Sequence, residues 1–232
     1  MNNLIYQKIK SQITNKHVNI VGIHGPQGIG KTTLSNFLHK KFTNENLKVV
    51  IFSIDQFYLK KNELIKFLKS CDDPMYKYRG LSGTHDLSLM HSCLQKLIKG
   101  DICFLPLFDK SIDNGFGDRS GYQKIDFKPD LIIIEGWMLA YKPSNNISYE
   151  LTLFNKLLEN YKIIQDLIDI WIILETDNIK NVINWRFGAE PTNGMSYNKF
   201  LLFMEPYMKV YENYQVNSLD KIILDKDKNI IS

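Results

Sequence analysis

The segment Gly25-Pro26-Gln27-Gly28-Ile29-Gly30-Lys31-Thr32 constrains the fold more than any other part of the 232-residue chain. It matches the pattern G-x-x-x-x-G-K-[ST], in which glycines let successive backbone N–H groups turn toward a phosphate. The apolar run before it, 18–24, predicts a strand, and the spacing of apolar residues after it predicts a helix over 31–44. A strand, this loop and a helix form the context that a phosphate-binding loop requires.

The residues of this loop have distinct expected contacts with a nucleotide. Lys31 is expected to neutralise charge on the β- and γ-phosphates, and Thr32 to place its hydroxyl on Mg²⁺. The glycines and the helix N-terminus supply backbone N–H donors. The alternative for the same pattern is a glycine loop with only a structural role. The predicted cofactor-binding residues are Gly25, Pro26, Gln27, Gly28, Ile29, Gly30, Lys31, Thr32 and Thr33.

The composition is that of a globular protein. Hydrophobic residues make up 44% of the chain and charged residues 23%, which is enough to bury a core and excludes disorder. The net charge of +4 is small and scattered, which argues against nucleic-acid binding. No apolar run approaches the roughly 20 residues of a membrane helix, and the N-terminal residues hold no apolar stretch of signal-peptide length. We therefore expect a single domain over 1–232, in the cytoplasm, with no nucleic-acid or membrane partner.

Apolar runs alternate with helical periodicity along the chain. This alternation predicts an α/β fold, a P-loop NTPase three-layer sandwich in which helices cover both faces of a mostly parallel sheet. Ligands of such sheets bind at the carboxyl ends of the strands. Further strands are predicted over 49–54, 102–107, 131–134, 171–174 and 221–224, and a polar, glycine-rich loop over 109–122. Further helices are predicted over 86–99, 150–168, 177–188 and 196–213.

Two carboxylates directly follow predicted strands. Asp55 ends the second strand, where it could accept a proton from an attacking hydroxyl or hold Mg²⁺ through water. The alternative for Asp55 is a helix N-cap. Glu135 follows the apolar run 131–134, which is the arrangement of a Walker B strand, and is expected to orient metal-bound water or contact substrate. The alternative for Glu135 is an ordinary turn residue.

Two polar clusters between the strands mix cations, small residues and hydroxyls, as a site for an anionic acceptor would. They are the segment 79–86 (RGLSGTHD) and the pair 108–111 (FDKS) and 117–119 (GDR). A further cation, Arg186, is predicted on a helix, from which a closing lid would bring it to the nucleotide phosphates. For His85 the alternative is a structural histidine, and for Arg186 a surface ion pair. The chain has only three arginines, Arg79, Arg119 and Arg186, and lysine cannot replace a planar guanidinium on a phosphate or carboxylate.

Several of these motifs, taken in order, resemble the D-glycerate 3-kinase family. They are GPQGIGKT, SIDQFYL, RGLSGTHD, FDKS with GDR, EGWMLAYKP, and WR followed by a late helix with Pro206-Tyr207. The family includes plant glycerate kinases and fungal relatives, and it is similar to the wider superfamily of phosphoribulokinase, uridine kinase and pantothenate kinase. The resemblance covers about residues 15–225.

The resemblance implies ATP and Mg²⁺ as cosubstrates, and an alcohol of a small acceptor as the nucleophile. The catalytic residues that it implies are Lys31, Asp55, Glu135 and Arg186. The implied acceptor-binding residues are Asp55, Tyr58, Arg79, Thr84, His85, Lys110, Arg119 and Glu135. The implied metal ligands are Thr32, Asp55 and Glu135.

The chain departs from the family pattern at two places. The family often has two aspartates where this chain has Asp55-Gln56, so a second carboxylate is missing beside the expected base. The expected lid, about residues 187–198, is short and contains no lysine or arginine.

We therefore expect an ATP-dependent kinase that transfers the γ-phosphoryl group to a hydroxyl of a small acid, with D-glycerate as the first candidate. The expected partners are ATP and this acceptor, and the chain is expected to be a monomer or a homodimer. One alternative is a kinase of the same superfamily with a sugar, a nucleoside or a pantothenate-like alcohol as acceptor. Another is an ATP-binding regulatory module without catalysis.

Overall fold

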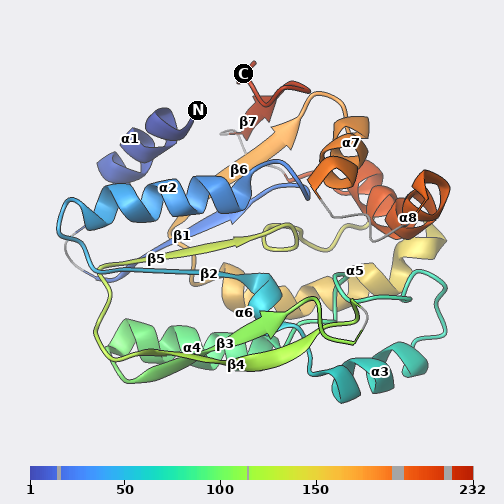
Figure 1. The fold of residues 1–232 in the computed structure, drawn as a ribbon, viewed down its shortest axis with the longest axis horizontal. Helices are drawn as coiled ribbons and strands as arrows, with labels where there is room; N and C mark the ends of the chain where they lie inside the picture. Colours follow the sequence, from blue (N-terminus) through green and yellow to red (C-terminus); the bar gives the residue numbers. More distant parts are fainter. Residues whose placement is uncertain (15–16, 114, 190–195, 217–220, 232) are drawn as a thin grey trace.

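The computed structural model describes residues 1–14, 17–113, 115–189, 196–216 and 221–231 of the chain. Within these ranges, the centre is a five-stranded parallel sheet in the order β2-β5-β1-β6-β7 (Figure 1). The strands are β1 (Asn19–His24), β2 (Val49–Ser53), β5 (Leu131–Gly136), β6 (Ile170–Thr176) and β7 (Lys221–Leu224). The predicted α/β fold with a mostly parallel sheet is confirmed.

The strands are apolar on both faces because helices cover both sides of the sheet. Strands β1 and β5 lie side by side near the middle, and every residue of both is buried. Alternate residues of a strand point to opposite faces. Accordingly, Ile20 and Ile132 belong to one hydrophobic cluster, whereas Val21 and Ile133 belong to another. A hydrophobic cluster on each face of the sheet gives the protein its three layers.

Helices α1 (Asn2–Gln12) and α2 (Lys31–Thr43) cover one face of the sheet (Figure 1). Leu34, Leu38 and Phe42 of α2 are fully buried, as the apolar spacing predicted. Helix α1 was not predicted from the sequence. Its buried stripe consists of only Ile5, Tyr6 and Ile9, and the polar residues around this short stripe hide the helical period.

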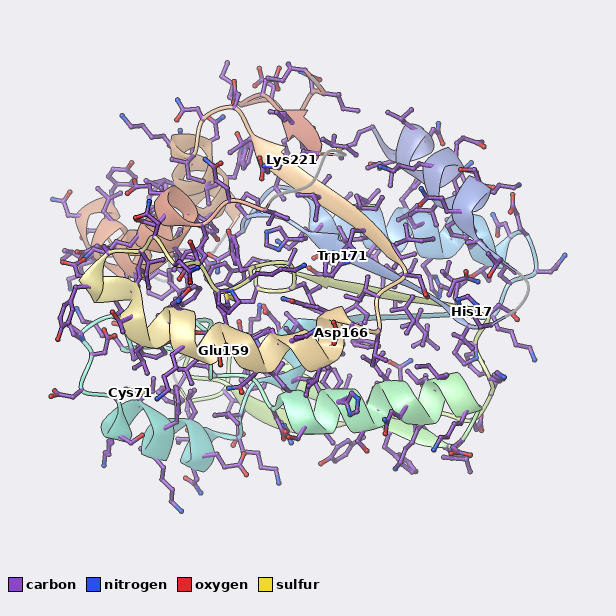
Figure 2. The ribbon with its side chains drawn as sticks, turned by 180° about the vertical axis from the view of Figure 1, so that it is seen from behind. His17, Cys71, Glu159, Asp166, Trp171 and Lys221 are labelled. Carbon is purple, nitrogen blue, oxygen red and sulfur yellow. The ribbon has the colours of Figure 1, made fainter. Side chains whose placement is uncertain are left out.

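The opposite face is covered by α4 (Leu87–Lys99), the segment 149–165 and α8 (Tyr197–Asn213). In Figure 2, seen from behind, the helical segment with Glu159 and Asp166 crosses in front of the sheet. This segment consists of α5 (Thr152–Leu158), α6 (Lys162–Gln165) and two 3-10 turns, Tyr149–Leu151 and Glu159–Tyr161. The single helix predicted over 150–168 is therefore interrupted. Phe154, Leu158 and Tyr161 all face the core, so the apolar period continues across the breaks and does not reveal them.

Two further helices lie near the ligand-binding edge of the sheet. Helix α3 (Lys61–Ser70) was not predicted, because Leu64 is its only fully buried residue. Helix α7 (Lys180–Ala189) begins three residues later than the predicted start at 177. Among the helices of the described ranges, none has the length and apolar character needed to cross a membrane.

The strand predicted over 102–107 lies outside the parallel sheet. It is β3 (Cys103–Asp109), which pairs antiparallel with β4 (Asp118–Ile125) in a separate two-stranded ribbon. The loop predicted over 109–122 is wrong in its second half, because β4 begins at residue 118. Only Ile125 of β4 is fully buried, so no apolar run in the sequence marks this strand.

The parallel register brings the carboxyl ends of three strands together. Ser53 of β2 and Ile23 of β1 lie on either side of Glu135 of β5. The phosphate-binding loop, Asp55 and Glu135 therefore leave the sheet at the same edge, which is where parallel α/β sheets bind ligands.

His24 ends β1 beneath the phosphate-binding loop and is only 2% exposed. Its Nδ1 accepts a hydrogen bond from the N–H of Ala140, at 3.2 Å. Burial, together with the ammonium groups of Lys31 and Lys221, lowers the pKa of His24 to about 3. The folded chain therefore holds this imidazole in its neutral form at neutral and mildly acidic pH.

We expect the free energy of unfolding to fall as the pH drops from about 6.5 toward 3, because the unfolded His24 takes up a proton that the folded form does not. One such group contributes a slope of about 1.4 kcal/mol per pH unit. His24→Asn retains a hydrogen-bond acceptor and should remove about that slope in urea titrations between about pH 6 and 4. His91→Asn, on the outside of α4, is the control. Equal slopes for wild type and His24→Asn would contradict the expectation.

Candidate active site

The phosphate-binding loop connects β1 to α2. Gly28 (φ +80°) and Gly30 (φ +110°) lie in the left-handed region, which L side chains rarely adopt. A Cβ on Gly28 would also lie 2.9 Å from the Cβ of Trp185 on α7. Gly30 is the N-cap residue of α2 and has no side chain to occupy the first helical N–H groups. These N–H groups are therefore available to a phosphate.

Lys31 begins α2 and is 8% exposed. Its ammonium donates to the carbonyl of Pro26 at 2.9 Å, so the side chain lies back along the loop. Burial lowers the pKa of Lys31, and the carboxylates of Glu135 and Asp55 oppose that effect. The ammonium thus contacts the loop and is close enough to the two carboxylates to be influenced by their charge.

Glu135 lies at the carboxyl end of β5, and its Oε1 accepts a hydrogen bond from the Thr32 hydroxyl at 3.3 Å. Burial raises the pKa of Glu135; the Lys31 ammonium opposes this rise, and the Asp55 carboxylate adds to it. The following residue, Gly136, has no room for a side chain, because a Cβ there would collide with Ile54. Thr32 and Glu135 thus place two oxygen atoms that could bind a metal ion side by side.

Asp55 lies on a 3-10 turn, η1 (Ile54–Phe57), directly after β2. The alternative reading of Asp55 as an N-cap does not describe this turn, because the N-cap is Ser53, whose Oγ accepts from the Asp55 N–H at 3.2 Å. Gln56 completes a capping box by accepting from the Ser53 N–H at 3.1 Å. Gln56 therefore helps to fix the turn that presents Asp55.

Both carboxylate oxygens of Asp55 accept hydrogen bonds from side chains. Oδ1 accepts from the Tyr58 hydroxyl at 2.9 Å, and Oδ2 accepts from the Lys110 ammonium at 2.7 Å. Burial would raise the pKa of Asp55, but the charge of Lys110 and these hydrogen bonds hold it well below its usual range. Asp55 is therefore an ionised carboxylate that can accept a proton.

Tyr58 is held by buried aromatic neighbours. Its ring stacks on His85 with centroids 4.6 Å apart and meets the edge of Phe108 at 5.2 Å. His85 Nδ1 lies 2.7 Å from the Tyr161 hydroxyl, and burial lowers the pKa of His85 to about 4. Thr84 is also buried, and its hydroxyl closes a turn by accepting from the Gly80 N–H and donating to a backbone carbonyl. His85 and Thr84 thus support Tyr58 and the backbone of residues 80–84.

The two arginines predicted for the acceptor have different surroundings. Arg79 donates through Nη1 to the carbonyls of Gly115 and Phe116, and its guanidinium lies over the rings of Tyr58 and Phe108. Arg119 is 9% exposed and pairs with Asp86 at 2.9 Å. Asp86 also caps α4 by accepting from the Leu89 N–H. Arg119 therefore joins β4 to α4.

Arg186 of α7 lies over the aromatic rings of Phe203 and Tyr207 on α8, with its Cζ 5.4 and 5.9 Å from the ring centroids. It faces the same cleft as the phosphate-binding loop. The expected lid over 187–198 falls largely on residues 190–195, which lie outside the described residues.

These side chains surround a cleft of about 300 Å³ at the carboxyl edge of the sheet. It is lined by Gln27, Gly28, Lys31, Thr32, Ser53, Asp55, Gln56, Phe108, Lys110, Glu135, Gly136, Trp137 and Arg186. All four residues predicted to be catalytic line this cleft. Of those predicted for the acceptor, Asp55, Lys110 and Glu135 line it, whereas Tyr58, Arg79, Thr84, His85 and Arg119 are not among the lining residues.

Ser53, Gln56 and Phe108 were not among the predicted site residues. The sequence carried a signal for two of them, because a serine followed three residues later by glutamine is a capping-box pattern. Phe108 adjoins the predicted Lys110 in the segment FDKS, but only the path of β3 brings its ring to Tyr58.

The comparisons with known proteins agree with this geometry. The model of the KAP family P-loop domain matches residues 1–70, which include β1, the phosphate-binding loop and β2. The uncharacterized kinase mug58 of Schizosaccharomyces pombe is 34% identical, over 89% of this chain and 84% of that protein. The chloroplastic D-glycerate 3-kinase of Arabidopsis thaliana is 33% identical, over 84% of this chain and 47% of that protein. The solved structure of a D-glycerate 3-kinase from Cryptococcus neoformans superposes with a TM-score of 0.87 at 26% identity, covering 100% of this chain and 98% of that one.

The fold, the phosphate-binding loop and these relatives define an ATP-dependent P-loop kinase. Relatives that are more than 30% identical extend over most of the chain, so the match is not limited to the nucleotide-binding segment. The chain belongs to the family of D-glycerate 3-kinase and its fungal relatives.

Thr32, Glu135 and Asp55 could hold Mg²⁺ that accompanies the nucleotide. Magnesium prefers oxygen ligands and often takes only one or two carboxylates from the protein, with phosphates and water supplying the rest. The donors here are one hydroxyl and two carboxylates. The described residues contain no group of three or more His, Cys, Asp or Glu that could hold a metal ion.

We expect Thr32→Val to weaken Mg-ATP binding by about tenfold, because a hydrogen-bonding hydroxyl is lost from the metal side of the cleft. Isothermal calorimetry checks this, with metal-free ADP as the second ligand. Metal-free ADP should bind wild type and variant alike. Thr32→Ser keeps the hydroxyl and is the matched control; an equal loss in both variants would argue against metal contact.

Proposed function

We propose that the chain transfers the γ-phosphoryl group of Mg-ATP to a hydroxyl of a small acid, with D-glycerate as the first candidate. The observation that carries this proposal is the position of Asp55. It is an ionised carboxylate at the cleft wall, and Lys31 and Glu135 line the same cleft. A carboxylate beside the nucleotide phosphates is suited to accept the proton of an attacking hydroxyl.

In the proposed reaction, the N–H groups of the loop and the ammonium of Lys31 hold the β- and γ-phosphates. Asp55 takes the proton of the acceptor hydroxyl while the oxygen of that hydroxyl bonds to the γ-phosphorus. The bond from this phosphorus to the β–γ bridging oxygen breaks, and ADP leaves. The guanidinium of Arg186 stabilises the negative charge on the transferring group. Mg²⁺, when bound through Thr32 and Glu135, neutralises phosphate charge. Phosphoryl transfer depends mainly on such positioning and charge neutralisation.

The cations around the far side of Asp55 support an anionic acceptor. Lys110 lines the cleft, and Arg79 lies directly behind Phe108 and Tyr58. Both cations attract the negative charge of an anionic acceptor, which a neutral acceptor would not offer. The Arabidopsis thaliana and Cryptococcus neoformans relatives are named D-glycerate 3-kinases, and D-glycerate is an acceptor of that chemistry. Arg119 takes a positioning role in this proposal, since its guanidinium pairs with Asp86.

The test is ADP release from Mg-ATP with a panel of acceptors: D-glycerate, L-glycerate, a hexose, uridine and pantothenate. We expect D-glycerate to stimulate release most strongly. Asp55→Asn should lower kcat by about 10²- to 10⁴-fold, because the proton acceptor is lost, while ATP binding changes little. Asp113→Asn, an aspartate on the loop between β3 and β4, is the control and should retain activity.

Stimulation by another panel member alone would replace D-glycerate but keep the kinase assignment. Tight ATP binding without stimulation by any acceptor would favour a regulatory nucleotide-binding module. Full activity of Asp55→Asn would remove Asp55 from the mechanism, whichever acceptor is used.

A further inference from the structure

Each carboxylate oxygen of Asp55 already accepts one hydrogen bond from a side chain, which leaves a lone pair on each oxygen for an acceptor hydroxyl. Tyr58 donates to Oδ1 and Lys110 to Oδ2, and both distances are those of good hydrogen bonds. A general base must lie within hydrogen-bond reach of the proton that it removes. In addition, an ammonium 2.7 Å from Oδ2 opposes the arrival of a proton on that oxygen. Asp55 therefore becomes a better proton acceptor when the ammonium moves away from Oδ2.

Tyr58 is the fixed donor. It is 4% exposed, its ring lies between His85 and Phe108, and the guanidinium of Arg79 lies over it. Moving its hydroxyl would disturb all of these contacts.

Lys110 is the exchangeable donor. Its side chain is 60% exposed and lies on the loop that follows β3. An exposed lysine has a flexible stem with several accessible rotamers, so its ammonium can move at small cost. An anion on the solvent side of Asp55, where Lys110 and Phe108 line the cleft, would compete with Asp55 for this ammonium.

The acceptor in the proposed function carries such an anion. In D-glycerate a single carbon separates the terminal CH₂OH group from the carboxylate, so an ammonium that leaves Asp55 for the carboxylate moves only a short way. Water and glycerol carry no charge and offer the ammonium nothing in exchange for Asp55.

We propose that Lys110 sets acceptor specificity by holding Oδ2 of Asp55 until the carboxylate of the acceptor draws the ammonium away. This inference rests on the proposed function. Once released, Oδ2 accepts the proton of the acceptor hydroxyl, the hydroxyl oxygen bonds to the γ-phosphorus, and the bond from that phosphorus to the β–γ bridging oxygen breaks. The anion that identifies the correct acceptor thus also frees the base. Water does not draw the ammonium away, so Lys110 stays on Oδ2 of Asp55 and the hydrolysis of ATP is not assisted by this base.

The test uses Lys110→Met, which removes the charge and keeps much of the side-chain length. We expect kcat/KM for D-glycerate to fall by about 10- to 100-fold, because a charged hydrogen bond to the acceptor is lost. We expect ADP release without acceptor, and release with glycerol, to rise several-fold over wild type. The two changes have opposite signs, which loss of stability or of phosphate binding alone would not produce.

Lys61→Met is the matched control. Lys61 pairs with Asp113 of the same loop at 2.7 Å and is not among the residues that line the cleft. It removes an equal charge from the neighbourhood and should leave both rates close to those of wild type.

An equal fall in both rates in Lys110→Met would overturn the inference and assign Lys110 to the transferring phosphoryl group. An unchanged rate of acceptor-free ADP release would overturn it as well. Failure of the proposed function has a different signature, since wild type would then bind ATP without any response to D-glycerate. In that case the rate of ADP release without acceptor in Lys110→Met still tests whether Lys110 restrains Asp55.

Discussion

The parallel pairing of β2, β5 and β1 is the constraint on which the rest of the structure depends. Because the three strands run in the same direction and in fixed register, Ser53, Glu135 and Ile23 reach one edge of the sheet side by side. A different group follows each strand: Asp55 after β2, Glu135 at the end of β5, and the phosphate-binding loop after β1. Only β5 separates β2 from β1, so Asp55 and the phosphate-binding loop line the same cleft.

Residues close to the strands of this sheet could be predicted from the sequence. The phosphate-binding loop combines a local pattern with a flanking strand and helix, and both flanks were found where expected. Asp55 and Glu135 were predicted because a carboxylate after an apolar run is visible in the chain itself. Parallel topology then makes such residues neighbours, even though 80 positions separate them in the sequence.

Residues that depend on tertiary contacts could not be placed in the same way. Arg79 and Arg119 look alike in the sequence, yet one lies over Tyr58 and Phe108 and the other is paired with Asp86. The antiparallel partner β4 carries no apolar run, so nothing local shows that it is a strand. The link between Lys110 and Asp55 joins the loop after β3 to the turn after β2, and only the folded chain brings the two together.

At position 56 a side chain can affect both the shape of the turn and the charge of the cleft. The amide oxygen of Gln56 holds the turn by accepting from the Ser53 N–H, and it does so without adding a negative charge to the cleft. Gln56 therefore contributes to the position of Asp55 and not to the charge of the cleft. The cost of this arrangement is that loss of the Gln56 amide would loosen the turn that carries Asp55 while leaving the charge of the cleft unchanged.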